Sequence, residues 1–216
     1  MEHLKKDAII ILDFGSQYTQ LIARRIREFN VYSEVVSPEI DLISIKEKNP
    51  RAIILSGGPS SVFLDDAPDF DINILNTDIP ILGICYGLHL LVHHNGGAVN
   101  STGKGEYGFA KVDFTRGNVI TEHMSDTSNV WMSHMDQVTK VPDGWQVIAT
   151  SSNGVVAGLI NPKQNKIATQ FHPEVSHTEE GGQLLNNFIF KTAKCEKNWT
   201  PSNFIKEQVK KIKEKS

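Results

Sequence analysis

Short runs of apolar residues recur along the first half of the chain, and each run is bounded by residues that favour turns. They are AIIIL at 8–12, VYSEVV at 31–36, AIIL at 52–55 and IPILGI at 79–84. Continuous apolar runs of this length are typical of strands that are covered on both faces. The first half of the chain therefore predicts a buried parallel sheet.

Helical patterns lie between these runs. Residues 16–29 carry apolar side chains at helical spacing, and we expect Ser16 to cap the start of this helix. Residues 88–97, LHLLVHHNGG, predict a second helix that ends at the paired glycines. Because strand, helix and strand alternate, we expect an open, mostly parallel, doubly wound α/β sheet with flanking helices. Ligands of such sheets bind at the carboxyl ends of the strands.

The second half of the chain has a different pattern, of short β-rich segments separated by turns. It predicts a smaller antiparallel or mixed β subregion, followed by a helix over residues 179–194. The predicted strands lie within 106–114, 129–134, 145–151, 155–161 and 166–173.

Composition restricts the classes of function. The chain has 216 residues, a formal net charge of -3 and only two cysteines, Cys85 and Cys195. A small negative charge gives no electrostatic case for nucleic-acid or membrane binding. So few cysteines fit free thiols in a reducing compartment. The first apolar run is too short for a membrane span and lacks a cleavage pattern. We expect a cytoplasmic protein that binds neither nucleic acid nor membrane.

Cys85 lies between two glycines in GICYG, directly after a predicted strand and before a predicted helix. The spacing G-x-C-x-G matches a nucleophile elbow, in which a tight turn exposes the nucleophile and glycines avoid clashes. A thiol at a helix N-terminus is also favoured as the thiolate. The motif predicts a catalytic nucleophile. The alternative is a buried small hydrophobic residue, which is the usual role of a free cysteine.

A histidine and a glutamate stand two residues apart in QFHPEVSH at 170–177. Pro173 favours an extended His172, and in an extended segment the side chain of Glu174 lies on the same side. A carboxylate in that place orients an imidazole and stabilises its charged form. The pair predicts a general base beside Cys85, provided that the fold brings the two segments together. A strand-ending histidine with a surface glutamate is the alternative.

Two glycines follow a strand in LSGGPSSV at 55–62. Their backbone N–H groups could cradle an oxyanion or a phosphate. The stretch also resembles the SGGxDS pyrophosphate loop, but Ser60 replaces the aspartate of that loop and Pro59 removes one donor. The histidines of the second helix lack a carboxylate or cysteine at a fitting spacing, so we expect no metal site.

Together, the motifs resemble the class I glutamine amidotransferase family. GICYG, LSGGPSS and QFHPEVSH carry the resemblance, which covers roughly residues 7–194. Three further stretches, at 13–28, 130–138 and 195–205, resemble the branch of this family whose ammonia is used to make GMP from XMP. The resemblance implies that Cys85 attacks the side-chain amide of glutamine, that His172 protonates the departing ammonia and that Glu174 orients His172.

The resemblance also implies which residues hold the substrate. The backbone amides of Gly58 and Tyr86 would form the oxyanion hole. Main-chain groups of residues 133–135 would contact the α-amino and α-carboxylate groups of glutamine. The expected oxyanion and substrate-binding residues are Gly57, Gly58, Tyr86, His89, Ser133, His134 and Met135.

Two of these residues depart from the pattern of the family. His89 stands where the family usually has glutamine, and Met135 replaces a glycine. An imidazole offers one donor and one acceptor in a different geometry from an amide. A catalytically impaired regulatory or scaffold module is therefore one alternative, and a γ-glutamyl peptide hydrolase is another.

The family also implies a partner. Its ammonia is taken up by a synthetase domain, an ATP pyrophosphatase that uses ATP and Mg²⁺, and no second α/β pattern follows residue 205. We expect an amidotransferase domain at 1–194, which needs no cofactor of its own. A linker and the start of a helix would follow at 195–216, with the synthetase in the same chain or in a separate subunit. The apolar side of that helix would be Phe204, Ile205, Val209 and Ile212.

Overall fold

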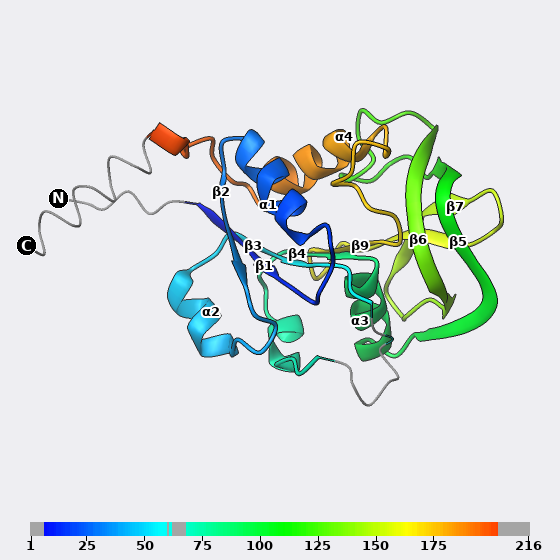
Figure 1. Ribbon diagram of the computed structural model, residues 1–216, viewed down its shortest axis with the longest axis horizontal. Helices are drawn as coiled ribbons and strands as arrows, with labels where there is room; N and C mark the ends of the chain where they lie inside the picture. The colour runs from blue at the N-terminus through cyan, green and yellow to red at the C-terminus, as the bar shows by residue number, and fades with distance from the viewer. Residues whose placement is uncertain (1–6, 60, 62–67, 203–216) are drawn as a thin grey trace, which may run out of the picture.

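The computed structural model describes residues 7–59, 61 and 68–202. Within these residues, nine strands form one continuous sheet in the order β2-β1-β3-β4-β9-β8-β7-β5-β6, with helices on both faces (Figure 1). The predicted doubly wound α/β fold is confirmed.

The parallel part of the sheet contains all four apolar runs of the first half. Every pairing between neighbours in this part is parallel. Its strands are β1 (Ala8–Leu12), β2 (Tyr32–Val36), β3 (Ala52–Leu55), β4 (Ile81–Ile84) and β9 (Lys166–Thr169).

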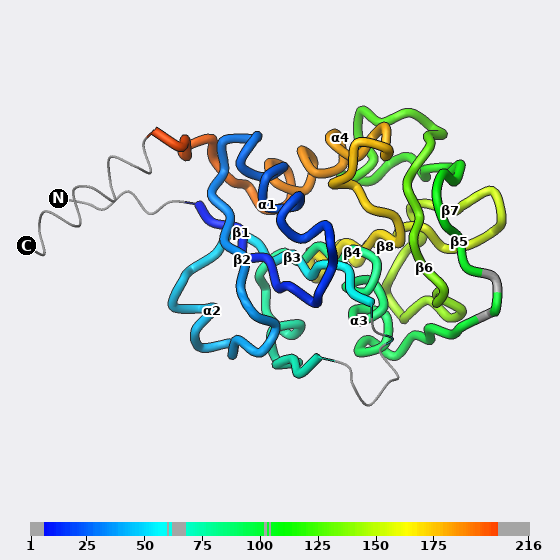
Figure 2. The backbone as a smooth tube through the Cα atoms, in the orientation of Figure 1, coloured from blue at the N-terminus to red at the C-terminus, as the bar shows by residue number. Residues whose placement is uncertain are grey.

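The antiparallel part continues the same sheet. β9 pairs with β8 in the antiparallel sense, so it joins the two parts. The predicted antiparallel subregion is therefore an extension of the main sheet, and it occupies one end of the molecule (Figure 2). Its other strands are β5 (Ala98–Phe114), β6 (Thr127–Lys140), β7 (Gln146–Ser151) and β8 (Val156–Asn161).

The helices cover the two faces of the sheet and produce two hydrophobic cores. Alternate residues of β1 illustrate the division, because Ile9 and Ile11 belong to one core and Ile10 and Leu12 to the other. One core contains side chains from α1 (Thr19–Glu28), α4 (Gly181–Asn186) and the π-helical segment Asn187–Thr192. The other contains side chains from α2 (Leu42–Lys48), the 3-10 segment Ile72–Asn76 and α3 (Tyr86–His94).

The predicted cap of the first helix is wrong. Helix α1 begins at Thr19, and the residue that caps it, Tyr18, makes no side-chain cap hydrogen bond. The Ser16 hydroxyl instead accepts the Tyr18 N–H at 3.1 Å. The Thr19 hydroxyl donates to Asp13 at 2.7 Å. Ser16 thus stabilises a turn that precedes the helix, because a serine hydroxyl can accept a hydrogen bond from the amide two residues on.

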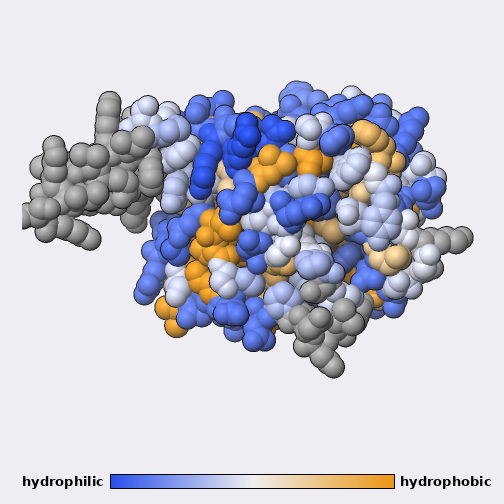
Figure 3. All heavy atoms as spheres, viewed as in Figure 1, coloured by the Kyte–Doolittle hydropathy of each residue, from blue (hydrophilic) through white to orange (hydrophobic). Residues whose placement is uncertain are grey.

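The segment after the last helical turn packs back onto the domain as far as Trp199. Cys195 and Trp199 are both buried, and the Glu196 N–H donates to Asp7 at 2.7 Å. The apolar residues expected on the last helix lie outside the described residues: Phe204, Ile205, Val209 and Ile212. None of the described helices is both long and apolar enough to cross a membrane. Hydrophilic side chains cover most of the face in Figure 3, with an apolar patch over α2 and β2.

Candidate active site

The carboxyl ends of two adjacent strands bring the predicted catalytic segments together. β4 and β9 are parallel neighbours, with Ile84 opposite Thr169. Cys85 therefore leaves one strand beside the point where Gln170 leaves the other, and the Cys85 N–H donates to the Thr169 carbonyl at 2.7 Å. The edge that was expected to hold the ligand is the edge where these segments meet.

Cys85 adopts a strained backbone conformation between β4 and α3. Its φ is +52° and its ψ is -100°, a combination that a residue with a side chain rarely adopts. The two flanking glycines allow this turn to pack closely. A Cβ on Gly83 would lie 2.5 Å from the Gly87 carbonyl oxygen, and a Cβ on Gly87 would lie 2.4 Å from the Leu55 carbonyl oxygen. The turn has the geometry of a nucleophile elbow, as the motif predicts.

His172 and Glu174 form a buried pair next to this turn. The distance from His172 Nδ1 to Glu174 Oε1 is 2.7 Å, and both side chains are almost fully buried. The predicted contact is confirmed, but Pro173 and Glu174 lie in a turn and not in an extended segment. The Arg25 side chain of α1 donates to the Glu174 carbonyl at 2.9 Å and ties this turn to the helix.

The charge on His172 depends on its two partners. Burial on its own would lower the pKa of the imidazole. Hydrogen bonds to the Cys85 side chain and to Glu174, together with the negative charge of both partners, raise this pKa above its ordinary value. The arrangement favours an imidazolium between a sulfur and a carboxylate, which is the state that a proton donor to a leaving group needs.

Cys85 and His172 open onto the same cavity of about 300 Å³, close to the lower limit for small-molecule sites. The Tyr18 ring packs edge-on against the His172 ring, with 5.1 Å between the ring centroids. Gly57 lies beside both side chains, because a Cβ on it would lie 3.2 Å from His172 Cε1 and 3.6 Å from Cys85 Cβ. Cys85 is only 6% exposed, but the exposed part faces this cavity.

A second hollow of about 350 Å³ adjoins the first and shares Gly58, Pro59, Cys85 and Ser133 with it. The Ser133 carbonyl lies 3.7 Å from Cys85 Sγ. Tyr107 and Met135, which are 65% and 48% exposed, stand at its rim. Six of the seven expected substrate-binding residues line this hollow: Gly58, Tyr86, His89, Ser133, His134 and Met135.

Three residues of the site were not singled out from the sequence. Gln170 is completely buried beside Cys85, and Tyr18 covers the His172 ring. Glu106 is buried behind His134, with 3.4 Å between His134 Nε2 and Glu106 Oε2. Gln170 lies in QFHPEVSH and Tyr18 in the stretch 13–28, but nothing in their spacing indicates which way their side chains point. Glu106 lies in a strand whose pattern carries no signal of a buried carboxylate.

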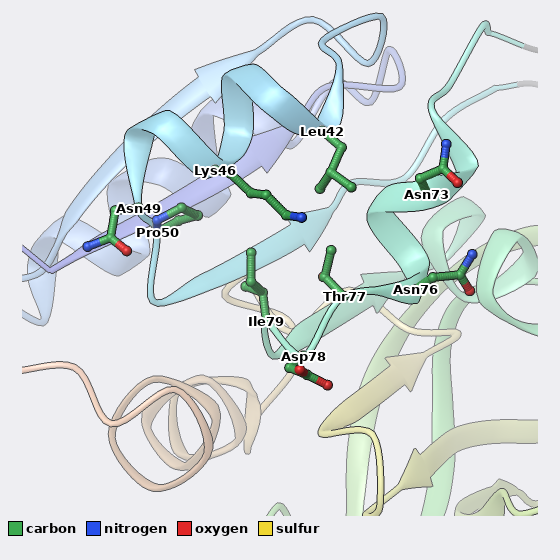
Figure 4. A pocket seen from close by; sticks show the side chains of 9 residues that line it. All are labelled: Leu42, Lys46, Asn49, Pro50, Asn73, Asn76, Thr77, Asp78 and Ile79. Atoms are coloured by element: carbon green, nitrogen blue, oxygen red, sulfur yellow. The ribbon is translucent and has the colours of Figure 1, made fainter.

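Another cavity, of about 660 Å³, lies elsewhere, between α2 and the segment 72–79 (Figure 4). Lys46 and Asp78 are the charged residues in its lining, which shares no residue with the two hollows at Cys85. Among the described residues, no group of three or more histidine, cysteine or acidic side chains could hold a metal ion.

Comparisons with known proteins give a family match and several similar proteins. Residues 10–192 match the family described as glutamine amidotransferase class-I. A GMP synthase [glutamine-hydrolyzing] from Brachyspira hyodysenteriae is 48% identical over 208 residues, which are 96% of this chain and 40% of that protein. A GMP synthase [glutamine-hydrolyzing] from Natranaerobius thermophilus is 45% identical over 97% of this chain and 41% of its own length. This chain therefore spans about two fifths of the length of these relatives.

Solved structures show the same fold. A protein from Thermoplasma acidophilum, assigned as one of the subunits of a GMP synthase, has a TM-score of 0.77 and 30% identity, over 90% of this chain and 96% of that chain. A glutamine amidotransferase from Thermotoga maritima has a TM-score of 0.69 at 19% identity, over 88% of this chain and 99% of that chain. The second likeness concerns the fold alone.

Proposed function

This chain belongs to the class-I glutamine amidotransferase family, and we propose that it hydrolyses the side-chain amide of glutamine to glutamate and ammonia with Cys85, His172 and Glu174. The observation that carries the proposal is a cysteine held at a φ of +52° on the cavity that it shares with His172. The hydrogen bond of 2.7 Å between His172 and Glu174 supports the roles given to these two residues.

The first step forms a thioester. The Cys85 thiolate attacks the amide carbon, and the negative charge that develops on the amide oxygen is held by the N–H groups of Gly58 and Tyr86. Tyr86 is the first residue of α3, so its N–H belongs to the helix end, where negative charge is favoured. The carbon–nitrogen bond then breaks while His172 gives its proton to the leaving nitrogen, and ammonia departs.

The second step releases glutamate. A water molecule attacks the thioester carbonyl while His172 accepts its proton, and the carbon–sulfur bond breaks to restore the thiolate. Glu174 keeps the imidazole oriented and stabilises its charged form in both steps. The main chain of residues 133–135, which lies along the second hollow, would hold the α-amino and α-carboxylate groups of glutamine.

The ammonia has to reach an acceptor before water protonates it. The relatives named GMP synthase are about two and a half times as long as this chain, so their remaining three fifths can contain a synthetase domain. We propose that such a domain, in the same chain or in a separate subunit, uses ATP and Mg²⁺ to activate XMP and converts it to GMP with this ammonia. The reaction would take place in the cytoplasm.

The test is glutaminase activity in three proteins: the chain itself, Cys85→Ala and Cys195→Ala. We expect glutamate from the chain and from Cys195→Ala, and none from Cys85→Ala. Cys195 is a suitable control because its thiol is buried outside the lining of the cavity, and burial raises its pKa to about 12. Equal glutamate formation by Cys85→Ala and the unchanged chain would exclude Cys85 as the nucleophile.

The same assay separates the alternatives. A γ-glutamyl peptide hydrolase would release the amine of a γ-glutamyl dipeptide faster than it releases ammonia from glutamine. A regulatory or scaffold module would hydrolyse neither compound, even when the complete synthetase is present. The assay should therefore include the synthetase, because amidotransferase sites can require their partner for full order.

A further inference from the structure

A line of buried hydrogen bonds runs from α3 to the sulfur of Cys85. His89 Nε2 lies 3.0 Å from Gln170 Oε1, and Gln170 Nε2 lies 3.8 Å from Cys85 Sγ. His89 is 4% exposed and Gln170 is completely buried, so water does not compete for these contacts. Gln170 thus stands between the imidazole and the nucleophile, with one end of its amide toward each.

The protonation state of the His89 imidazole determines which end of the Gln170 amide faces the Cys85 sulfur. Burial lowers the pKa of His89, so the imidazole is neutral and has one N–H group to donate. When Nε2 donates that N–H to Gln170 Oε1, the Gln170 NH₂ group faces Cys85. An N–H donor stabilises a thiolate, whereas the amide oxygen in the same place would repel it.

We propose that His89 is a positioning residue for the nucleophile, which fixes the Gln170 amide so that its NH₂ group donates to Cys85 Sγ. This inference rests on the proposed function only in the role it gives to the Cys85 thiolate. The resemblance implies that the residue at position 89 binds the substrate directly. The role proposed here for His89 is different, because it acts on the nucleophile. The departure from the usual glutamine at position 89 is then compatible with an active site.

Among the neighbours of Gln170, His89 is the residue that contacts its side-chain oxygen and so can orient the amide. Asp136 and His134, both from β6, are the charged or titratable neighbours of His89. The Asp136 backbone raises the pKa of His89, so it acts as an acceptor and competes with Gln170 for the single N–H of the neutral ring. We assign that N–H to Nε2, which lies 3.0 Å from Gln170 Oε1. Cys85 faces His172, whose other partner is Glu174. Among the described residues, the hydrogen bonds of the Gln170 side chain are the two given above.

The inference is tested by the rate at which iodoacetamide alkylates Cys85 between pH 6 and pH 9. Cys195 does not compete in this range, because burial raises its pKa to about 12. In His89→Leu the Gln170 amide loses its fixed orientation. We expect alkylation at pH 7 to slow by about threefold to tenfold and the whole profile to move to higher pH, in line with the loss of one hydrogen bond of ordinary strength.

Two variants on the same helix serve as controls. His89→Gln places an amide N–H near the position of imidazole Nε2, and we expect it to restore the profile of the unchanged chain. His94→Gln makes the same chemical change at an exposed position of α3, and we expect it to alter nothing. Thermal unfolding of each variant identifies any that lose the fold.

Gln170→Leu tests whether His89 acts on Cys85 through Gln170 or directly. We expect this variant to shift the profile as His89→Leu does, and the double variant to show no further shift, because effects on one shared contact are not additive. The inference is wrong if His89→Leu leaves the alkylation profile unchanged. It is also wrong if His89→Leu slows alkylation as much in the Gln170→Leu background as in the unchanged chain. A change in KM for glutamine without a change in alkylation would instead make His89 a substrate ligand.

Alkylation does not require glutamine hydrolysis. If the chain produces no glutamate but the profile responds to His89 as expected, the proposed function fails while the positioning role stands. If glutamate is produced and the profile does not respond, the positioning role fails alone.

Discussion

At the scale of single residues, the site depends on one strained backbone and one charged pair. Cys85 is held at a positive φ because its neighbours on both sides are fixed, by β4 before it and α3 after it. Strain of this kind persists only where the surrounding structure imposes it, and it concentrates at functional sites. The result is a sulfur that faces a cavity and has an imidazole beside it.

Glu174→Gln should change the dependence of glutaminase activity on pH. The variant keeps a hydrogen-bond acceptor but removes the negative charge that helps to raise the pKa of His172. A lower pKa means that His172 loses its proton at a lower pH, so the alkaline limit of kcat should move to lower pH. We expect kcat near neutral pH to fall by about 100-fold. Steady-state kinetics between pH 6 and pH 10 provide the measurement.

Glu180→Gln is the control for this change. Glu180 is outside the cavity and bonds to Ser125. The control should keep the profile of the unchanged chain. An alkaline limit that stays in place in Glu174→Gln would show that the charge of Glu174 does not set the proton affinity of His172.

At the scale of elements, the position of α3 depends on how closely it approaches β3. Gly87 lies in the first turn of α3, and its N–H donates to the Ser56 carbonyl at 3.2 Å. That approach leaves no room for a side chain, because a Cβ on Gly87 would also lie 2.7 Å from Leu55 Cβ. The glycine therefore sets the distance between the helix that follows Cys85 and the strand that precedes the Gly57–Gly58 loop.

Gly87→Ala should move α3 away from β3 and disturb both the fold and the site. We expect it to lower the free energy of unfolding by about 1–3 kcal/mol, the usual cost of an added methyl group in a packed interior. The rate of Cys85 alkylation should change with it. Urea unfolding and alkylation rates are the measurements.

Gly182→Ala is the matched control, because nothing lies within 4 Å of a Cβ at that position of α4. In a helix, alanine is more favourable than glycine by up to about 1 kcal/mol, so this variant should be as stable as the unchanged chain or more stable. A Gly87→Ala protein with unaltered stability would show that α3 can shift without cost.

At the scale of the whole molecule, residues 195–199 join the end of the described chain to the first two strands. The Trp199 N–H donates to the Asn30 carbonyl at 2.9 Å. The Arg27 guanidinium lies 6.0 Å from the centroid of the Trp199 ring, within the range of a cation–π contact. These contacts place the start of the expected linker against the domain, and the boundary at 194 stays a prediction.

Trp199→Ala should destabilise the domain without altering the site. Because the Trp199 side chain is buried, we expect the free energy of unfolding to fall by about 3 kcal/mol. Phe109→Ala removes an aromatic ring that is 66% exposed and should cost less than about 1 kcal/mol. Urea unfolding compares the two variants. A Trp199→Ala protein as stable as Phe109→Ala would mean that residues 195–199 contribute nothing to the fold.

Local sequence determined much of this protein. The continuous apolar runs at 8–12, 52–55 and 79–84 correspond to the fully buried strands β1, β3 and β4, because such runs suit strands that are covered on both faces. GICYG specifies the turn at Cys85, because only glycine fits where two backbones approach within a van der Waals distance. Local sequence also places Glu174 within reach of His172, but the contact is made in a turn that Arg25 of α1 holds and not in the extended segment that Pro173 predicts.

The tertiary structure decided everything that joins distant segments. β9 pairs with β4 and not with another edge, and this pairing places His172 beside Cys85. The contacts of His89 with Gln170, of Glu106 with His134 and of Tyr18 with His172 are likewise long-range. Local pattern states which residues are apolar or polar, but the direction of a buried polar side chain is set by partners that only the folded sheet brings within reach.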